Sequence, residues 1–183
     1  RNLFIFREYA KKRKKNQKCI FFDRDGVINK LNGYVSSVKK FNLNSGIGKI
    51  FKILNDKKVL VIIITNQSAI ARGLITENGL EKIHKYLCNK IKNSDDARID
   101  DIYYCPFLKN AKIKKYDKNS FFRKPNPGMI LNAIKRWDLE KFNCAMIGDS
   151  YTDEIAAKKA GIKFFYINKK PLFNKVGKII KKI

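Results

Sequence analysis

The sequence has few of the residues that mark several common classes of protein. Its four cysteines are scattered without the spacing of a disulfide framework, which is typical of a reducing compartment. No apolar run approaches the ~20 residues of a membrane-spanning helix, and no cleavable signal pattern stands at the start. The Gly-rich pattern of a P-loop is also missing, which disfavours that kind of nucleotide hydrolysis. We therefore expect a cytoplasmic protein that does not enter a membrane.

Acidic residues are scarce as well: 16 Asp and Glu stand against 41 Lys and Arg, for a formal net charge of +25. Such a charge is typical of nucleic-acid binding. The basic residues, mostly Lys, are however spread along the whole chain and form no distinct patch. We therefore favour a lysine-rich surface that attracts anionic substrates, and we expect no nucleic-acid partner.

The length of 183 residues fits one domain, which we place at residues 18–183. Residues 1–17 end in a polar, basic run, and we expect them to form an arm or linker. The first residue is Arg1 and not Met, so we expect a fragment, a processed product or the tail of a longer polypeptide.

Apolar strands alternate with amphipathic helices along the chain. This order predicts an α/β fold: an open, doubly wound parallel sheet with helices on both faces. We expect a small flap at 27–40 and no large cap domain. The predicted strands are 19–22, 59–64, 99–105, 144–147 and 163–167, and the predicted helices lie near 45–56, 76–91, 127–137, 150–159 and 172–180.

His84, the one histidine, lies beside the apolar stripe of the second predicted helix. We expect it to be at the helix surface or partly packed, and not catalytic.

Two carboxylates, Asp23 and Asp25, follow the first predicted strand. On an extended segment they point the same way, because side chains alternate between faces. Two like charges held so close need a cation between them or a shared proton. Mg²⁺ suits such a site, and Asp149 supplies a third carboxylate at the end of another predicted strand. Ligands of open α/β sheets bind at this edge.

These groups can transfer a phosphoryl group. Asp23 is the candidate nucleophile, because a carboxylate can attack phosphorus, and Asp25 is the candidate general acid and base. We expect Mg²⁺ to be held by Asp23, by Asp25 through its backbone carbonyl, and by Asp149.

Three further residues complete the predicted site. Thr65 and Lys124 would hold the other phosphoryl oxygens and stabilise the charge of the transition state. Asp153 would pair with Lys124 and orient it.

With these motifs in place, the chain resembles the haloacid dehalogenase superfamily of phosphohydrolases, subclass III. The motifs that carry the resemblance are 23–27, 64–66, Lys124 and 148–153, and it extends over residues 18–167. The resemblance implies a Rossmann-like fold and Mg²⁺-dependent hydrolysis of phosphomonoesters through an aspartyl-phosphate.

Within that superfamily the chain is similar to the D-glycero-D-manno-heptose 1,7-bisphosphate phosphatases and the related histidinol-phosphate phosphatase domains. This similarity implies a small phosphorylated sugar substrate on the way to nucleotide-activated heptose for surface glycans, and a monomer would suit it. It rests on segments 23–29, 33–35, 65–73, 103–106 and 123–129. The substrate contacts that it implies are Asn32, Gly33, Tyr34, Asn66, Gln67, Ser68, Arg123 and Ser150.

The chain departs from this family at a loop that usually carries a structural zinc. Cys105 is present, but Phe107, Ser120 and Phe122 stand at the other three ligand positions. One thiolate cannot make a tetrahedral site, so we expect no zinc and a loop held by aromatic packing. A family position that is usually basic is Ser150 here, which would loosen contact with a second phosphate.

Three alternatives remain. A polynucleotide 3′-phosphatase would share the Thr-Asn-Gln segment at 65–67 and the Arg-Lys-Pro segment at 123–125, and the charge would suit DNA. A histidinol-phosphate phosphatase would share most motifs. A non-catalytic binding domain is disfavoured because every catalytic motif is intact.

Overall fold

The computed structural model describes residues 4–6, 16–167 and 173–183. A six-stranded sheet runs through the molecule in the order β1-β4-β3-β2-β5-β6. Neighbouring strands are parallel, except that β1 is antiparallel to β4. The strands are β1 (Phe4–Phe6), β2 (Cys19–Phe22), β3 (Leu60–Asn66), β4 (Asp101–Cys105), β5 (Cys144–Gly148) and β6 (Lys163–Tyr166).

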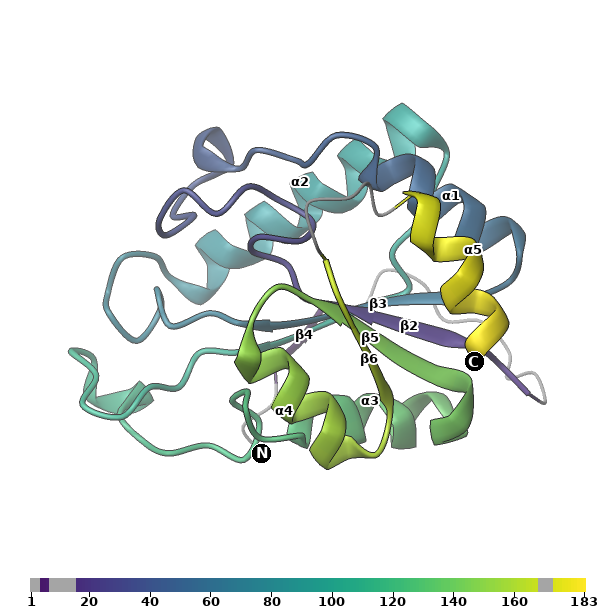
Figure 1. Cartoon of the computed structure of the whole chain (residues 1–183). Helices are drawn as coiled ribbons and strands as arrows, with labels where there is room; N and C mark the ends of the chain where they lie inside the picture. The colour runs from purple at the N-terminus through teal and green to yellow at the C-terminus, as the bar shows by residue number, and fades with distance from the viewer. Residues whose placement is uncertain (1–3, 7–15, 168–172) are drawn as a thin grey trace.

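Helices cover both faces of the sheet. Figure 1 shows α1, α2 and α5 on one face and α3 and α4 on the other. The helices are α1 (Ile47–Asp56), α2 (Glu77–Asp95), α3 (Gly128–Trp137), α4 (Tyr151–Ala160) and α5 (Phe173–Lys182). Short 3₁₀ turns occupy Val38–Lys40, Lys114–Tyr116 and Lys141–Asn143.

Each face of the sheet has its own hydrophobic core. In β2, Ile20 and Phe22 pack with α1, α2 and α5, whereas Cys19 and Phe21 pack with α3 and α4. Successive strand residues point to opposite faces, so a strand covered on both sides must be apolar throughout. The unbroken apolar run of β3 therefore indicates burial on both faces, and the predicted doubly wound fold is confirmed.

The path of the chain opens a crevice beside the central strand. From β2 it moves outward through β3 to β4, then crosses to β5 on the other side of β2 and continues to β6. The loops that leave β2 and β5 therefore diverge at the carboxyl edge, which is where such sheets bind ligands. Asp23 and Asp149 are the first residues after these two strands.

Two features differ from the sequence-based expectation. Residues 4–6, expected in an arm, form the edge strand β1. β3 continues through Asn66, so Thr65 lies inside the strand and not in the loop after it. Thr65 and Asn66 pair with Tyr104 and Cys105 of β4, and these pairs extend the parallel pairing of the two strands.

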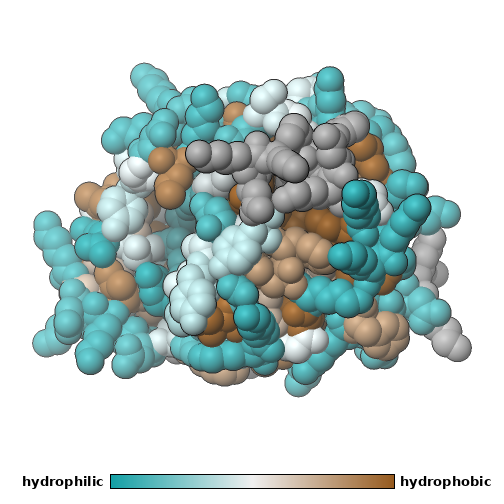
Figure 2. Space-filling view, viewed as in Figure 1, coloured by the Kyte–Doolittle hydropathy of each residue, from teal (hydrophilic) through white to brown (hydrophobic). Residues whose placement is uncertain are grey.

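The connection from β2 to β3 contains the segment predicted to be a flap. The predicted flap at 27–40 is a loop that ends in one 3₁₀ turn, and no insertion within 16–167 is large enough to be a separate cap domain. Hydrophilic residues cover most of the face in Figure 2, with smaller hydrophobic areas between them. None of the described helices has the length and apolar character needed to cross a bilayer.

Candidate active site

A pocket of about 390 Å³ opens at the carboxyl edge of the sheet. Its walls come from the ends of β2, β3 and β5 and from the flap. Nine of the predicted site residues line it: Asp23, Asp25, Gly33, Tyr34, Asn66, Gln67, Ser68, Asp149 and Ser150. Thr65 and Lys124 are buried residues outside this lining. Asn32 and Arg123 are also not part of it.

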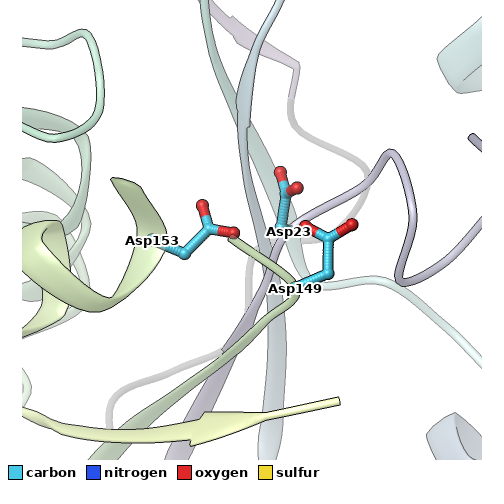
Figure 3. Close-up of side chains that lie close together, drawn as sticks. All are labelled: Asp23, Asp149 and Asp153. Atoms are coloured by element: carbon cyan, nitrogen blue, oxygen red, sulfur yellow. The ribbon is translucent and has the colours of Figure 1, made fainter. Parts of the chain in front are cut away.

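Three carboxylates converge beside the pocket. One oxygen each from Asp23, Asp149 and Asp153 lies within 4.8 Å of the others. Figure 3 shows Asp23 and Asp149 beside each other at the strand ends and Asp153 projecting toward them from α4. Residues more than 120 positions apart in the sequence thus meet, because the parallel strands β2 and β5 are neighbours.

Two glycines allow this close approach. A Cβ on Gly26 would lie 1.8 Å from Oδ2 of Asp149, and the φ of Gly26 is +90°, which other residues rarely adopt. A Cβ on Gly148 would lie 2.5 Å from Cβ of Asp153. Both positions therefore require glycine if the carboxylates are to converge.

Lys124 ties two of the carboxylates together. Its Nζ lies 2.6 Å from Oδ1 of Asp23 and 2.6 Å from Oδ1 of Asp153, and it donates to the carbonyl of Ile64 at 3.0 Å. The contact with Asp153 is the one predicted from the sequence. Asn66 holds the backbone of Lys124 from both sides, because its Oδ1 accepts from the amide and its Nδ2 donates to the carbonyl.

Burial sets the protonation behaviour of this cluster. It raises the pKa of Asp23 to about 7, against the lowering effect of Lys124 and with a further increase from Asp153. Burial and the charge of Asp153 also raise the pKa of Asp149. Burial opposes the charge of Lys124, but the two carboxylates outweigh it and its pKa is raised. Burial is therefore the main reason why the charged forms of Asp23 and Asp149 are disfavoured, and the charge of Asp153 adds to it.

Asp25 is in a different environment. Arg24 donates to both of its oxygens at 2.9 Å from Nη2, and Nε adds a contact of 3.2 Å to Oδ1. Asn29 donates to Oδ1 at 3.0 Å and Gln67 donates to Oδ2 at 2.8 Å. Burial would raise the pKa of Asp25, but the charge of Arg24 and these hydrogen bonds lower it overall. Asp25 is therefore held as a carboxylate.

Two residues in this environment are not indicated by any sequence pattern. Arg24 is fully buried, and its Nη1 contacts Nε2 of His84 at 3.2 Å. The expectation of a surface or partly packed His84 is wrong, because its side chain is fully buried and stacks edge-to-face with Tyr104 at 5.8 Å. Neighbours on a strand usually point to opposite faces, so nothing in the sequence suggests that Arg24 folds back onto Asp25.

Several predicted substrate residues also have partners inside the protein. Besides its bond to Asp25, Gln67 donates to the hydroxyl of Thr65 and accepts from Arg24. Ser150 donates to Asp153 at 2.7 Å and caps α4 in a capping box. Arg123 donates to the carbonyl of Phe107 at 3.1 Å. Their roles toward substrate stay predictions.

The donor set fits a hard divalent cation. It consists of carboxylate oxygens, which Mg²⁺ prefers, and these oxygens converge from Asp23, Asp149 and Asp153. Both oxygens of Asp153 already contact Lys124 or Ser150. Asp23 and Asp149 are consequently the carboxylates with capacity for an ion.

Comparisons with known proteins agree with this geometry. The model of the haloacid dehalogenase-like hydrolase family matches residues 30–161. The D-glycero-beta-D-manno-heptose-1,7-bisphosphate 7-phosphatase of Rhodopseudomonas palustris is 39% identical over 79% of this chain and 80% of its own length. The D-glycero-alpha-D-manno-heptose-1,7-bisphosphate 7-phosphatase of Burkholderia mallei is 36% identical over 79% of this chain and 76% of its own length.

A solved structure extends the comparison to three dimensions. D,D-heptose 1,7-bisphosphate phosphatase from B. bronchiseptica, complexed with magnesium and phosphate, superposes with a TM-score of 0.74 at 30% identity. The superposition covers 81% of this chain and 79% of that one.

Proposed function

Since the chain belongs to the haloacid dehalogenase-like hydrolase family and is a phosphatase, we propose that it removes the 7-phosphate from D-glycero-D-manno-heptose 1,7-bisphosphate. One observation carries the proposal: Asp23 and Asp149 converge at the pocket beside Asp25, and the buried Lys124 contacts Asp23. The relatives named for this activity support the choice of sugar.

The reaction proceeds in two steps. An oxygen of Asp23 attacks phosphorus, and the bond from phosphorus to the sugar oxygen breaks as the acyl-phosphate forms. The sugar oxygen takes a proton from Asp25. Asp25 then removes a proton from water, which attacks the phosphorus, releases phosphate and restores the Asp23 carboxylate.

The lowered pKa of Asp25 has a consequence for the first step, because the free protein holds this residue as a carboxylate. Asp25 must therefore receive a proton when substrate binds. A phosphomonoester monoanion, with a second pKa of about 6, carries such a proton. Lys124, buried between Asp23 and Asp153, supplies positive charge next to the attacking oxygen.

We propose Mg²⁺ as the cofactor, held by Asp23, Asp149 and the backbone carbonyl of Asp25. When bound, it neutralises charge on the phosphoryl oxygens. The phosphatase from B. bronchiseptica is complexed with magnesium, which supports this choice.

We also propose that the loop at 106–122 works without zinc. Phe107 packs against Tyr116 at 6.1 Å, and the ammonium of Lys118 lies 4.2 Å from the centre of its ring. Burial raises the pKa of the Cys105 thiol, which disfavours the thiolate that zinc requires. Metal analysis of the purified protein should find no stoichiometric zinc, and a zinc chelator should leave its melting temperature unchanged. One zinc per chain would contradict the proposal.

A substrate panel tests the function. With Mg²⁺, kcat/KM should be highest for one anomer of the heptose bisphosphate, and ³¹P NMR of the product should show loss of the 7-phosphate. Fructose 1,6-bisphosphate and histidinol phosphate are the small phosphorylated substrates used for comparison. A higher kcat/KM for either would contradict the assignment of the sugar.

The net charge of +25 favours one second candidate, a polynucleotide 3′-phosphatase. A 3′-phosphorylated oligonucleotide belongs in the same panel for this reason. We propose that it is not hydrolysed, and that the enzyme acts as a cytoplasmic monomer without a nucleic-acid partner. Oligonucleotide binding that weakens steeply with salt, together with 3′-phosphate release, would favour the second candidate instead.

A further inference from the structure

Arg24 lies in the sequence between the proposed nucleophile and the proposed general acid, where an arginine would ordinarily be assigned to the substrate phosphate. Its burial argues against that assignment. The side chain is fully buried and is not part of the pocket lining. A buried guanidinium needs a carboxylate and further acceptors to be stable, and Arg24 finds them within the protein.

The donors of Arg24 are directed at three acceptors. Nη2 and Nε reach the carboxylate of Asp25, Nη2 also reaches Oε1 of Gln67 at 3.1 Å, and Nη1 reaches Nε2 of His84 at 3.2 Å. Two parallel contacts to one carboxylate restrict its rotation as well as its position. The geometry therefore fixes the direction in which Asp25 presents its oxygens.

His84 limits the movement of Arg24 in turn. An arginine has no acceptor, so Nε2 of His84 must accept the hydrogen bond and the ring proton must lie on Nδ1. His84 lies in the middle of α2, and its buried ring makes an edge-to-face contact with Tyr104 of β4. Burial, followed by the charge of Arg24, holds the pKa of His84 well below its usual range, which agrees with a neutral ring.

We propose that Arg24 and His84 are positioning residues: His84 holds Arg24, and Arg24 orients the carboxylate of Asp25 toward the leaving oxygen. The role rests on the proposed function, because it requires Asp25 to act as acid and base. Neither residue touches substrate. Their loss should therefore impair proton transfer and leave substrate binding unchanged.

The dependence of the rate on the leaving group tests this role. Release of a sugar oxygen needs a proton from Asp25, whereas release of p-nitrophenolate does not. General acid catalysis contributes about 100-fold or more. We expect His84→Phe to lower kcat/KM about 10-fold and Arg24→Lys about 100-fold for the sugar bisphosphate. For p-nitrophenyl phosphate the decrease in kcat/KM, which does not include the later attack of water, should stay below about 3-fold, and KM for the sugar should not change.

Two further variants separate positioning from a loss of folded protein. His84→Gln keeps an acceptor for Arg24 and should recover most of the activity that His84→Phe loses. Trp137→Phe removes a different buried hydrogen bond, the one to Asp101 on the α3 face. It should leave the ratio of the kcat/KM values for the two substrates unchanged. Equal losses for both substrates in His84→Phe and Arg24→Lys would overturn the proposal.

A spectroscopic measurement is independent of activity. The chain has one histidine, so ¹⁵N NMR of protein without a histidine tag reports on His84 alone. At pH 7 we expect a neutral ring with the proton on Nδ1, and a changed Nε2 shift in Arg24→Lys. A proton on Nε2 would refute the arrangement. A wild-type protein inactive on both substrates would refute the proposed function, and the NMR result would still decide the hydrogen bond.

Discussion

Two arrays of charge lie at the same edge of the sheet, and they differ in charge balance. In one, Lys124 is the ammonium shared by Asp23 and Asp153, with Asp149 close by. In the other, Arg24 matches the single carboxylate of Asp25. The first array has three carboxylates for one cation, and the second has one carboxylate for one cation.

The difference explains the opposite directions of the two pKa shifts. In the unbalanced array burial dominates, and the pKa of Asp23 rises to about 7. In the balanced array the guanidinium and the hydrogen bonds prevail over burial, and the pKa of Asp25 falls. We expect the unbalanced array to attract a cation, whereas the paired contacts from Arg24 fix the geometry of the carboxylate of Asp25. The two aspartates are only two residues apart, yet their surroundings suit them to different tasks.

The largest expected effect comes from removing the nucleophile. Asp23→Asn should lower kcat more than about 1000-fold, because an amide cannot form the acyl-phosphate. Steady-state kinetics on the sugar bisphosphate measures this loss. Circular dichroism should show an unchanged fold, and retained turnover would reject Asp23 as nucleophile.

The second largest effect concerns cation binding, which should distinguish the two arrays. Mg²⁺ should raise the melting temperature of the wild-type protein, by the equivalent of about 2.7 kcal/mol when Mg²⁺ reaches 100 times its dissociation constant. Asp149→Asn should abolish this response. Asp56→Asn is the matched control, because Asp56 is an exposed acid paired with Lys52 on α1. A response to Mg²⁺ that survives in Asp149→Asn would place the ion elsewhere.

The approach of the two strand ends depends on Gly26. In Gly26→Ala the new Cβ would overlap Oδ2 of Asp149, and we expect a loss of about 1–3 kcal/mol of unfolding free energy together with weaker Mg²⁺ binding. Chemical denaturation measures the first effect and calorimetry the second. Gly46→Ala is the control, since Gly46 has a φ of +78° and no atom within 4 Å of the added Cβ.

Gly46→Ala should lose only the part of the unfolding free energy that comes from the preference for glycine at a positive φ. Its affinity for Mg²⁺ should not change. Equal behaviour of the two variants would mean that the space beside Asp149 is not limiting.

The last comparison concerns the pH dependence of stability without metal. The pKa of Asp23 rises from 3.8 to about 7 on folding, so the folded state binds more protons between these values and the contribution of Asp23 to stability falls as pH rises. His84, with its lowered pKa, acts in the opposite direction. Comparison with Asp23→Asn isolates Asp23. This variant should be more stable than wild type at pH 8, and the difference should shrink toward pH 4.

Denaturant titrations at these two pH values measure the difference. A difference in unfolding free energy between Asp23→Asn and the wild type that stays constant with pH would show that Asp23 keeps its ordinary pKa.

The sequence predicted those parts of the molecule that depend on local pattern. The apolar runs indicated the parallel strands, and the polar residues after them indicated the edge at which Asp23, Asp149 and Lys124 meet. These predictions succeed because parallel strands place their carboxyl ends together. The separation of the motifs in the sequence does not matter once the strand order is right.

Apart from the contact between Lys124 and Asp153, the sequence could not predict how polar side chains pair in the interior. Arg24, Gln67 and His84 each have an ordinary surface or substrate interpretation, and only the packing of α2 on the sheet shows that they bind one another. The same is true of Asn66, which holds the backbone of Lys124. The edge strand at residues 4–6 was missed because three residues are too few to show a period.

The central claim is that Asp23 carries the phosphoryl group. Acid quenching during turnover of the heptose bisphosphate, followed by peptide mass mapping, tests it most directly. We predict one added phosphoryl group on the peptide that contains Asp23, and none in Asp23→Asn. A phosphoryl group on any other residue, or full turnover with no labelled peptide, would contradict it.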